Sequence, residues 1–295
     1  MDRLAAMRTF VEIVDRGSLT AAAEALDRSQ PAVVRTLAAL ESHLGTRLLR
    51  RTTRRMSLTP EGRDYLDRCR RILADVEDAE RAVGQDEGEP RGELRMTAPV
   101  QFGQWHVAPA VSAFLDRYSQ VRVDLLLLDR NIDLVEEAVD LALRIGHLAD
   151  STMIAVQVGE VRRVVCASRT LIKETGTPDD PGALSDYPCI RQQVLSHGTA
   201  WLFRDGLVKI DGAFGCNQVG ASVTACVAGV GFGQFLSYQV QEFVRDGQLE
   251  VVLEEFETEP LPVNLVYPGG RLVSERLRAL INWLKDALRG SDAFD

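Results

Sequence analysis

The chain has 295 residues, of which 45% are hydrophobic and 26% charged, and its formal net charge is -9. These values are typical of a soluble globular protein with about two domains of roughly 150 residues each. No run of 18 apolar residues occurs, and charges interrupt the N-terminal segment where a signal peptide needs an apolar block, so we expect a cytoplasmic protein without a membrane span.

The net charge hides an asymmetry along the chain. Residues 1–60 hold ten arginines and six acidic residues, a net of +4, whereas the rest of the chain has a net of -13. The segment RLLRRTTRR, residues 47–55, has five arginines and no acidic residue. A basic N-terminal segment followed by an acidic remainder indicates that a polyanion binds to the N-terminal segment only.

The first 45 residues predict three helices. Apolar residues at helical spacing begin at Leu4, and Gly17 followed by Ser18 is typical of a helix end and the N-cap of a new helix. A short alanine-rich helix, LTAAAEAL, follows. The next segment, SQPAVVRTLAALESHLG, has Ser29 as the expected N-cap and Pro31 in the first turn, where its missing N–H group costs nothing.

The third predicted helix has two different faces. At 100° per residue Val33, Leu37, Leu40 and Leu44 form one stripe, which we expect to be buried. Pro31, Arg35 and Ala38 lie on the opposite side, with Val34 on the flank. A solvated face would carry more Glu and Lys, whereas a slim face around one arginine suits the DNA major groove.

The basic segment that follows predicts a small two-stranded wing over TRLLRRTTRRMSLT. Its arginines and threonines can contact phosphates, which position a protein on a duplex without reading the sequence. Arg51 and Arg55 alternatively pair with acidic residues of the next helix.

A long helix is predicted to begin at Pro60. Leu66, Cys69, Leu73, Val76 and Val83 are spaced as alternating threes and fours, with Glu80 interrupting the apolar seam at one step, which favours pairing with a second copy of the helix. The composition of DEGEPRG, residues 86–92, is typical of a hinge.

From residue 93 onward the pattern is α/β. The expected strands are ELRMTA, VRVDLLLLD, LALRI, RRVVCAS, LVKIDG, FGQFLS and LPVNLVYP, and the expected helices include WHVAPAVSAFLDRY, IDLVEEAV, QVGASVTACVAG and SERLRALINWLKDAL. Alternating strands and helices predict parallel sheets covered on both faces, here in two lobes with a cleft between them.

Several motifs of the chain resemble those of a known family. GSLTAAAEALDRSQPAVVRTLAALESHLGTRLLRRTTRRMSLTPEG resembles the winged helix-turn-helix of LysR-type transcriptional regulators. PRGELRMTAPVQFG, DRNIDLVEEAVDLALRIG, WLF and GVGFG are similar to the effector-binding half of that family. The fold class that this implies is α+β and multidomain.

The resemblance also implies domain limits. We expect a DNA-binding domain at 1–59, a linker helix for dimerisation at 60–87, a hinge at 88–92 and an effector-binding domain at 93–295. The last resembles type 2 periplasmic binding proteins, with lobe I at about 93–162 and 267–295 and lobe II at about 163–266. Its two crossings between lobes are expected near 161–165 and 264–268.

Family membership further implies the partners. They are double-stranded promoter DNA, a second copy through the linker helix with assembly into tetramers, RNA polymerase, and a small metabolite, anionic or aromatic, in the cleft. No cofactor, metal, membrane contact or enzymatic activity is expected. The expected DNA-binding residues are Ser29, Gln30, Pro31, Val34, Arg35, Arg50, Thr52, Thr53 and Arg54. The family often has serine at the position of Val34, so apolar contact replaces a hydroxyl there.

For the metabolite, helix starts after strands are the expected positions, because free N–H groups there attract anions. Thr97 precedes one such helix, and Asn217 and Gln218 precede another. The resemblance adds Ala98, Arg144 and Gln193. Arg144 either neutralises a ligand carboxylate or makes a structural ion pair.

Two other classes of protein compete with this interpretation. A solute receptor would explain a cleft but requires export and leaves RLLRRTTRR without a use, and an enzyme on a two-lobed scaffold is compatible with the fold alone. GVGFG follows a helix and precedes a strand, which favours a tight turn over a dinucleotide site. The four histidines and five cysteines have no metal-ligand spacing.

Overall fold

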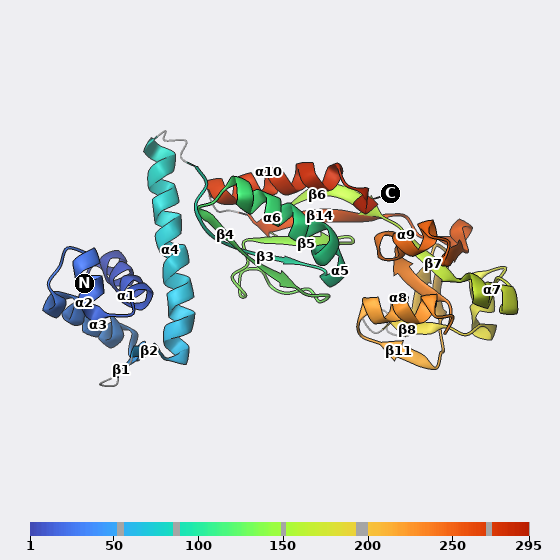
Figure 1. Ribbon diagram of the computed structural model, residues 1–295, viewed down its shortest axis with the longest axis horizontal. Coiled ribbons are helices and arrows are strands. Elements are labelled where there is room, and N and C mark those ends of the chain that lie inside the picture. Colours follow the sequence, from blue (N-terminus) through green and yellow to red (C-terminus); the bar gives the residue numbers. More distant parts are fainter. Residues whose placement is uncertain (52–55, 85–88, 149–151, 193–199, 270–272, 295) are drawn as a thin grey trace. The chain divides into compact units, whose positions relative to one another are not determined.

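The computed structural model describes the chain apart from residues 52–55, 85–88, 149–151, 193–199, 270–272 and 295 (Figure 1). By its internal contacts the chain divides into two compact units, Met1–Gly88 and Glu89–Asp295. Within the described residues, no helix is both long enough and apolar enough to cross a membrane.

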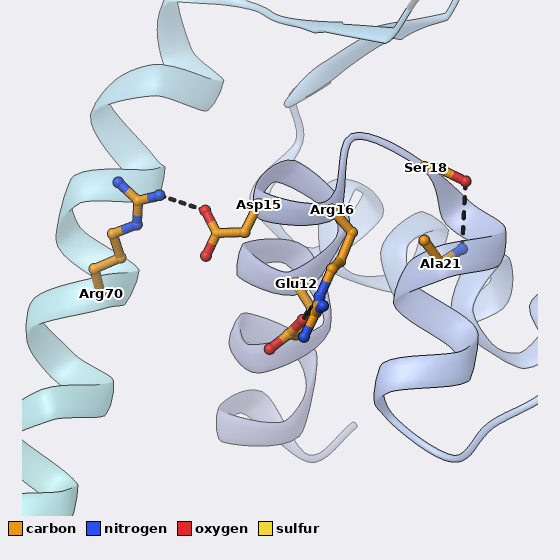
Figure 2. A network of polar contacts seen from close by, with 6 residues as sticks. All are labelled: Glu12, Asp15, Arg16, Ser18, Ala21 and Arg70. Carbon is orange, nitrogen blue, oxygen red and sulfur yellow. Dashed lines mark hydrogen bonds and ion pairs between the residues drawn. The ribbon is translucent and has the colours of Figure 1, made fainter.

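The first unit opens with the three predicted helices. Gly17 closes the first helix in the left-handed conformation at φ 66°, and the Ser18 hydroxyl accepts a hydrogen bond from the Ala21 N–H at 3.3 Å (Figure 2). Both features match the predicted stop and N-cap. The unit contains α1 (Arg3–Arg16), α2 (Leu19–Ala25), α3 (Gln30–Leu44), β1 (Leu49–Arg51), β2 (Met56–Leu58) and α4 (Pro60–Gly84).

The core of this unit joins α1, α2 and α3 to the start of α4. Leu66 and Cys69 of α4 are buried in the same cluster as Phe10 and Val33. An ion pair between Arg70 of α4 and Asp15 of α1 lies beside this packing (Figure 2). The prediction that Leu66 and Cys69 pair with a second copy is therefore wrong, since their own chain already covers both side chains.

The predicted wing is confirmed as an antiparallel pair of strands. Leu49 of β1 lies opposite Leu58 of β2. The Thr59 hydroxyl donates to the Arg47 carbonyl at 2.7 Å and accepts from the Gly62 N–H at 2.9 Å. This threonine therefore ties the base of the wing to the first turn of α4.

The first lobe of the second unit is built on a five-stranded sheet in the order β4-β3-β5-β14-β6. The strands β3, β4 and β5 are parallel, but β14 runs antiparallel to both β5 and β6. The expected all-parallel sheet is therefore wrong on one side. The strands are β3 (Gly92–Ala98), β4 (Val121–Leu127), β5 (Leu141–Ile145), β6 (Met153–Val161) and β14 (Leu261–Pro268).

Helices cover one face of this sheet. The helix that begins at α5 (Val100–Phe102) continues through a π-helical stretch, Gly103–Val107, into α6 (Ala108–Arg117). Helix α10 (Glu275–Arg289) runs along the same face as α6 (Figure 1). The Trp283 indole N–H donates to the Ala110 carbonyl at 2.8 Å, which joins the two helices.

The opposite face is covered by the segment between β4 and β5, not by a helix. Ile132, Leu134 and Val139 of this segment pack against Val266. The Asp133 carboxylate accepts from the Val135 and Glu136 N–H groups, and Ala138 has a positive φ of 54°. The helix expected over IDLVEEAV is therefore wrong, because this backbone forms turns.

The second lobe has smaller sheets in the orders β12-β7-β13, β11-β8 and β10-β9. Its core clusters bury Phe235 and Phe232 with the surrounding strands and helices. The lobe contains β7 (Arg163–Ser168), α7 (Arg169–Thr175), the 3-10 helix Pro181–Asp186, β8 (Ile190–Gln192), β9 (Ala200–Phe203), β10 (Gly206–Lys209), β11 (Phe214–Cys216), α8 (Val219–Val227), β12 (Gly233–Leu236), α9 (Ser237–Arg245), β13 (Leu249–Val252) and the 3-10 helix Glu254–Phe256. A last 3-10 helix, Asp292–Phe294, follows α10 in the first lobe.

The chain passes between the lobes twice. The first passage, between β6 and β7, falls within the expected 161–165. The second was expected at 264–268, which is wrong, because β14 pairs with β6 over its whole length from Leu261 to Pro268. The chain has therefore returned to the first lobe by Leu261. GVGFG forms the predicted turn between α8 and β12, with Gly229 at φ 81°.

Candidate functional site

Helix α3 presents a slim face of small residues around one arginine on the surface of the first unit. Val33 and Leu37 are fully buried and Leu40 is 1% exposed, whereas Pro31, Arg35 and Ala38 are exposed and Val34 is half-buried. This division matches the helical-wheel prediction except at Leu44, which is 36% exposed because it ends the helix. The exposed face has the small residues and single arginine that a major groove accepts.

The N-terminal end of α3 is open. Ser29 occupies the N-cap position, as predicted, but its side chain makes no capping hydrogen bond. Ser29 and Gln30 are both exposed. The turn before them is tight, since Asp27 has a φ of 49° and the Arg28 N–H donates to the Ala23 carbonyl at 2.9 Å. Pro31 has no N–H group, and the Ala32 and Val33 N–H groups donate to the Ser29 carbonyl at 2.9 and 3.1 Å, so the exposed Ser29 hydroxyl is the group that can meet an anion here.

The wing carries part of the expected basic surface. Arg50 is exposed in β1, opposite Ser57 in the register. Thr52, Thr53 and Arg54 were expected to bind DNA and lie outside the described residues. Sequence reasoning did not identify the contact that fixes the wing to α3, in which the Glu41 carboxylate accepts hydrogen bonds from the Leu48 and Leu49 N–H groups at 2.9 and 3.2 Å.

The second unit contains a cavity of about 270 Å3 lined by residues of both lobes. The first lobe contributes the ends of β3 and β5, the start of β14 and the segment after β4, and the second lobe contributes residues of β7, β8 and β12 and the starts of α8 and α9. Three arginines and one aspartate line it: Arg130, Arg144, Arg163 and Asp129. Its wall therefore has an excess of positive charge.

Half of the six expected ligand residues line this cavity. Thr97, Ala98 and Arg144 are in its wall. Asn217 and Gln218 are exposed at the start of α8 and are not among the lining residues, although the next residue, Val219, is. Gln193 lies outside the described residues. Pairing between strands, which the sequence does not give, determines which of these helix starts faces the cavity.

The free N–H group expected after Thr97 is already occupied. The Val100 N–H donates to the Asp129 carboxylate at 2.9 Å. The Thr97 side chain is 7% exposed. The first turn of the helix that begins at Val100 is therefore a weaker anion site than the sequence indicated.

Arg144 is held by the segment between β4 and β5. Its Nη2 donates to the Ile132 carbonyl at 2.6 Å. Hydrogen bonds from the Glu136 and Val135 N–H groups lower the pKa of the Asp133 carboxyl, and the positive charge of Arg144 lowers it further. Of the two roles left open for Arg144, these contacts favour the structural one.

Sequence reasoning missed Arg163 and Gln192. Arg163 is partly buried at the start of β7; within the described residues its Nε has no hydrogen-bond partner, and burial lowers its pKa. Gln192 is 3% exposed, and its Nε2 likewise has no partner there. No sequence signal distinguishes these residues from ordinary polar strand residues.

Other polar residues of the wall are already paired. The Gln234 amide exchanges two hydrogen bonds with the backbone of Leu202, at 3.3 and 2.9 Å. The Gln239 amide binds the Leu236 N–H at 2.9 Å and the Tyr238 hydroxyl at 3.1 Å. Burial raises the pKa of the Tyr238 hydroxyl well above its ordinary value. These groups shape the cavity, whereas Arg163 and Gln192 leave donors free.

Comparison with known proteins identifies both halves of the chain. Residues 4–63 match the family described as bacterial regulatory helix-turn-helix protein, lysR family, and residues 87–289 match the LysR substrate binding domain. The chain belongs to the LysR family. This LysR-family chain is thus a transcriptional regulator with an effector-binding domain, as its motifs indicated.

Individual relatives are similar to this LysR-family regulator over nearly all of its length. It is 34% identical over 295 residues to an HTH-type transcriptional repressor of Pseudomonas aeruginosa. The matched region covers 97% of this chain and 92% of the relative. The solved structure of CrgA, a LysR-type transcriptional regulator from Neisseria meningitidis, is 31% identical, with a TM-score of 0.63 over 97% of this chain and 99% of that one. The virulence activator AphB of Vibrio cholerae, at 23% identity and a TM-score of 0.60 over 95% of this chain and 98% of that one, shares the fold.

Proposed function

We propose that this regulator binds double-stranded promoter DNA in a sequence-specific manner, with α3 in the major groove and the wing against the phosphates. The observation that carries the proposal is the division of α3 into a buried stripe and an exposed face. Arg35 and Pro31 are exposed while Val33 and Leu37 are fully buried. An α-helix fits the major groove, and its outward side chains then meet the base edges.

The residues of this surface have different chemical roles in the proposal. Arg35 donates to guanine or phosphate, Gln30 can pair with adenine, and Val34 offers an apolar contact to a thymine methyl group. The exposed Ser29 hydroxyl contacts phosphate. Arg50 contacts the backbone, together with Thr52, Thr53 and Arg54 as the sequence predicts.

Control by a small metabolite is the second part of the proposal. A cavity of about 270 Å3 between two lobes, lined by Thr97, Ala98 and Arg144, supports it. A ligand that contacts both lobes shifts the population toward the conformation that it binds best. We propose that this shift changes DNA binding and the recruitment of RNA polymerase, in the cytoplasm where bacterial DNA lies.

Self-association through α4 belongs to the same proposal. Because Leu66 and Cys69 face their own chain, the surface for a second copy has to include other residues of the helix. Ile72 is 40% exposed on α4 and is suited to such a contact. Dimers bind two half-sites, and tetramers join two dimers on one promoter.

The test is binding of the purified chain to the duplex upstream of its own gene. Fluorescence anisotropy at increasing KCl concentration should show steep weakening of affinity, because each neutralised phosphate releases a counterion. A scrambled duplex of equal length and composition should bind more weakly at every salt concentration. Equal affinity for both duplexes would overturn the sequence-specific role, and absence of binding to either duplex is the result that a solute receptor or an enzyme predicts.

A further inference from the structure

Strand β7 places two neighbouring arginines in opposite environments. Arg162, just before the strand, is exposed and pairs with Glu257 at 3.1 Å and with Glu254 at 3.6 Å. Arg163, the first residue of the strand, is partly buried and lines the cavity. Successive side chains of a strand point to opposite faces, which accounts for the difference.

Arg163 has neither the hydrogen-bond partner of Arg144 nor the solvent exposure of Arg130. Arg144 donates to the Ile132 carbonyl, and Arg130 is exposed to solvent. No ion pair of Arg163 occurs among the described residues, and the same residues leave its buried Nε without an acceptor. A desolvated guanidinium without an acceptor is unfavourable unless something else supplies negative charge.

Gln192 provides a second free donor in the same wall. Its side chain is 3% exposed and its Nε2 has no partner within the described part of the chain. The two other glutamines of the wall, Gln234 and Gln239, are hydrogen-bonded to the backbone. Among the described residues of the wall, the buried donors without a partner are thus on Arg163 and Gln192.

We propose that Arg163 and Gln192 receive the carboxylate of a small organic acid that carries one negative charge. The planar guanidinium fork matches a carboxylate, and the glutamine amide adds a further donor. The inference rests on the proposed metabolite control and names the class of ligand and the residues that select it.

The rest of the wall defines the body of this acid. Phe235, Leu236 and Leu261 line the cavity and suit an apolar chain or ring. Asp129, also in the wall, repels a second carboxylate. The volume of about 270 Å3 lies just below the range of about 300–1,000 Å3 that is usual for ligand pockets, so the acid is small.

The first measurement needs no ligand. Arg163→Met removes a desolvated charge without a partner, so thermal unfolding of the ligand-free full-length chain should shift upward by about 2 °C or more. The matched control is Arg162→Met, which removes an exposed, paired charge and should leave the unfolding temperature unchanged or slightly lower. A lower unfolding temperature for Arg163→Met would mean that Arg163 has a structural partner, and would overturn the proposal.

The second measurement uses phenylacetate and hexanoate at millimolar concentration, with phenylacetamide and hexanamide as neutral counterparts. The acids should bind the wild-type chain in calorimetry, and the amides should bind at least tenfold more weakly. Arg163→Met and Gln192→Leu should each weaken binding of the acids, the former by at least tenfold, and Arg162→Met should not. Arg163→Lys keeps the charge without the fork and should retain part of the preference for acids.

Contrary outcomes separate this inference from the proposed function. Equal binding of acids and amides, binding of amides alone, or unchanged acid binding in Arg163→Met would overturn the role of Arg163 while leaving metabolite control in place. Absence of binding by both acids would overturn the ligand class. Loss of the preference for upstream DNA would overturn the proposed function whatever the cavity binds.

Discussion

The Glu41 carboxylate of α3 accepts a hydrogen bond from the Leu48 N–H at 2.9 Å, so the helix that we assign to the groove also holds the start of the wing. The neighbouring Leu49 N–H donates to the same oxygen at 3.2 Å. Two surfaces separated in the sequence are therefore oriented by one side chain. A change at Glu41 should alter both stability and the geometry of DNA contact.

Glu41→Ala should lower the free energy of unfolding of the first unit by about 1–2 kcal/mol, because two backbone N–H groups lose a charged acceptor. Affinity for specific and scrambled duplexes should fall together, since the wing contacts phosphates. Urea denaturation and anisotropy measure the two effects. Glu24→Ala, at an exposed position of α2, is the control and should change neither.

Gly62→Ala should destabilise the first unit by about 2–4 kcal/mol. A Cβ at Gly62 would lie 2.0 Å from the Leu48 carbonyl oxygen, which is backbone and cannot turn away. The matched control is Gly220→Ala in α8, where the added Cβ would lie 3.5 Å from the Gln101 amide. This variant should be neutral or slightly more stable, because alanine favours helices. Equal unfolding temperatures in calorimetry would show that the wing does not lie against α4 at Gly62.

Stability should depend on pH through His106. Burial lowers the pKa of the imidazole below its ordinary value, although the Asp292 and Glu242 carboxylates act in the opposite direction. The ring lies against Phe102 and Tyr238, and its Nε2 has no partner within the described residues. Because the unfolded chain takes up the proton first, this contribution to stability is complete above about pH 6.5 and is lost as the pH falls toward the folded pKa.

The measurement is the free energy of unfolding from pH 8 to pH 5 for the wild-type chain and His106→Phe. The variant should show a flatter decline below about pH 6.5, because it has no imidazole to protonate. His147→Phe replaces an exposed histidine and should keep the wild-type slope. A His106→Phe curve parallel to the wild-type curve would mean that His106 is protonated equally in both states.

Val34→Ser should change base preference with little change in stability. Val34 is half-buried on the flank of α3, and serine is the residue that the resemblance implies at this position. A hydroxyl can donate to bases or phosphate, whereas valine favours a thymine methyl group. Selection from a pool of random duplexes measures the preference. Identical selected sequences for both proteins would exclude position 34 from base contact.

The sequence predicted the first unit better than the second. The stripe of Val33, Leu37 and Leu40 follows from helical periodicity alone, and Gly17 with Ser18 follows from capping chemistry. Leu66 and Cys69 were assigned to a second copy because periodicity shows that a stripe is buried but not what covers it. Only the observed packing against α1 shows that the chain itself, and not a second copy of α4, covers this stripe.

In the second unit the errors came from strand pairing and from local turns. The residue pattern of β14 predicts a buried strand, but it does not predict that this strand runs antiparallel between β5 and β6. The Asp133 turn and the positive φ of Ala138 override an apolar spacing that suits a helix. Arg163 could not be recognised because the absence of a partner is a property of the assembled wall.

The most direct test of the central claim is the ratio of affinities for the upstream and scrambled duplexes in Arg35→Ala. The control is Arg68→Ala, which removes the same charge from an exposed position of α4. We predict that Arg35→Ala loses about 1–3 kcal/mol of discrimination, a reduction of roughly fivefold or more in the ratio, whereas Arg68→Ala retains the wild-type ratio. A wild-type ratio in Arg35→Ala would contradict the assignment of α3 as the helix that reads DNA.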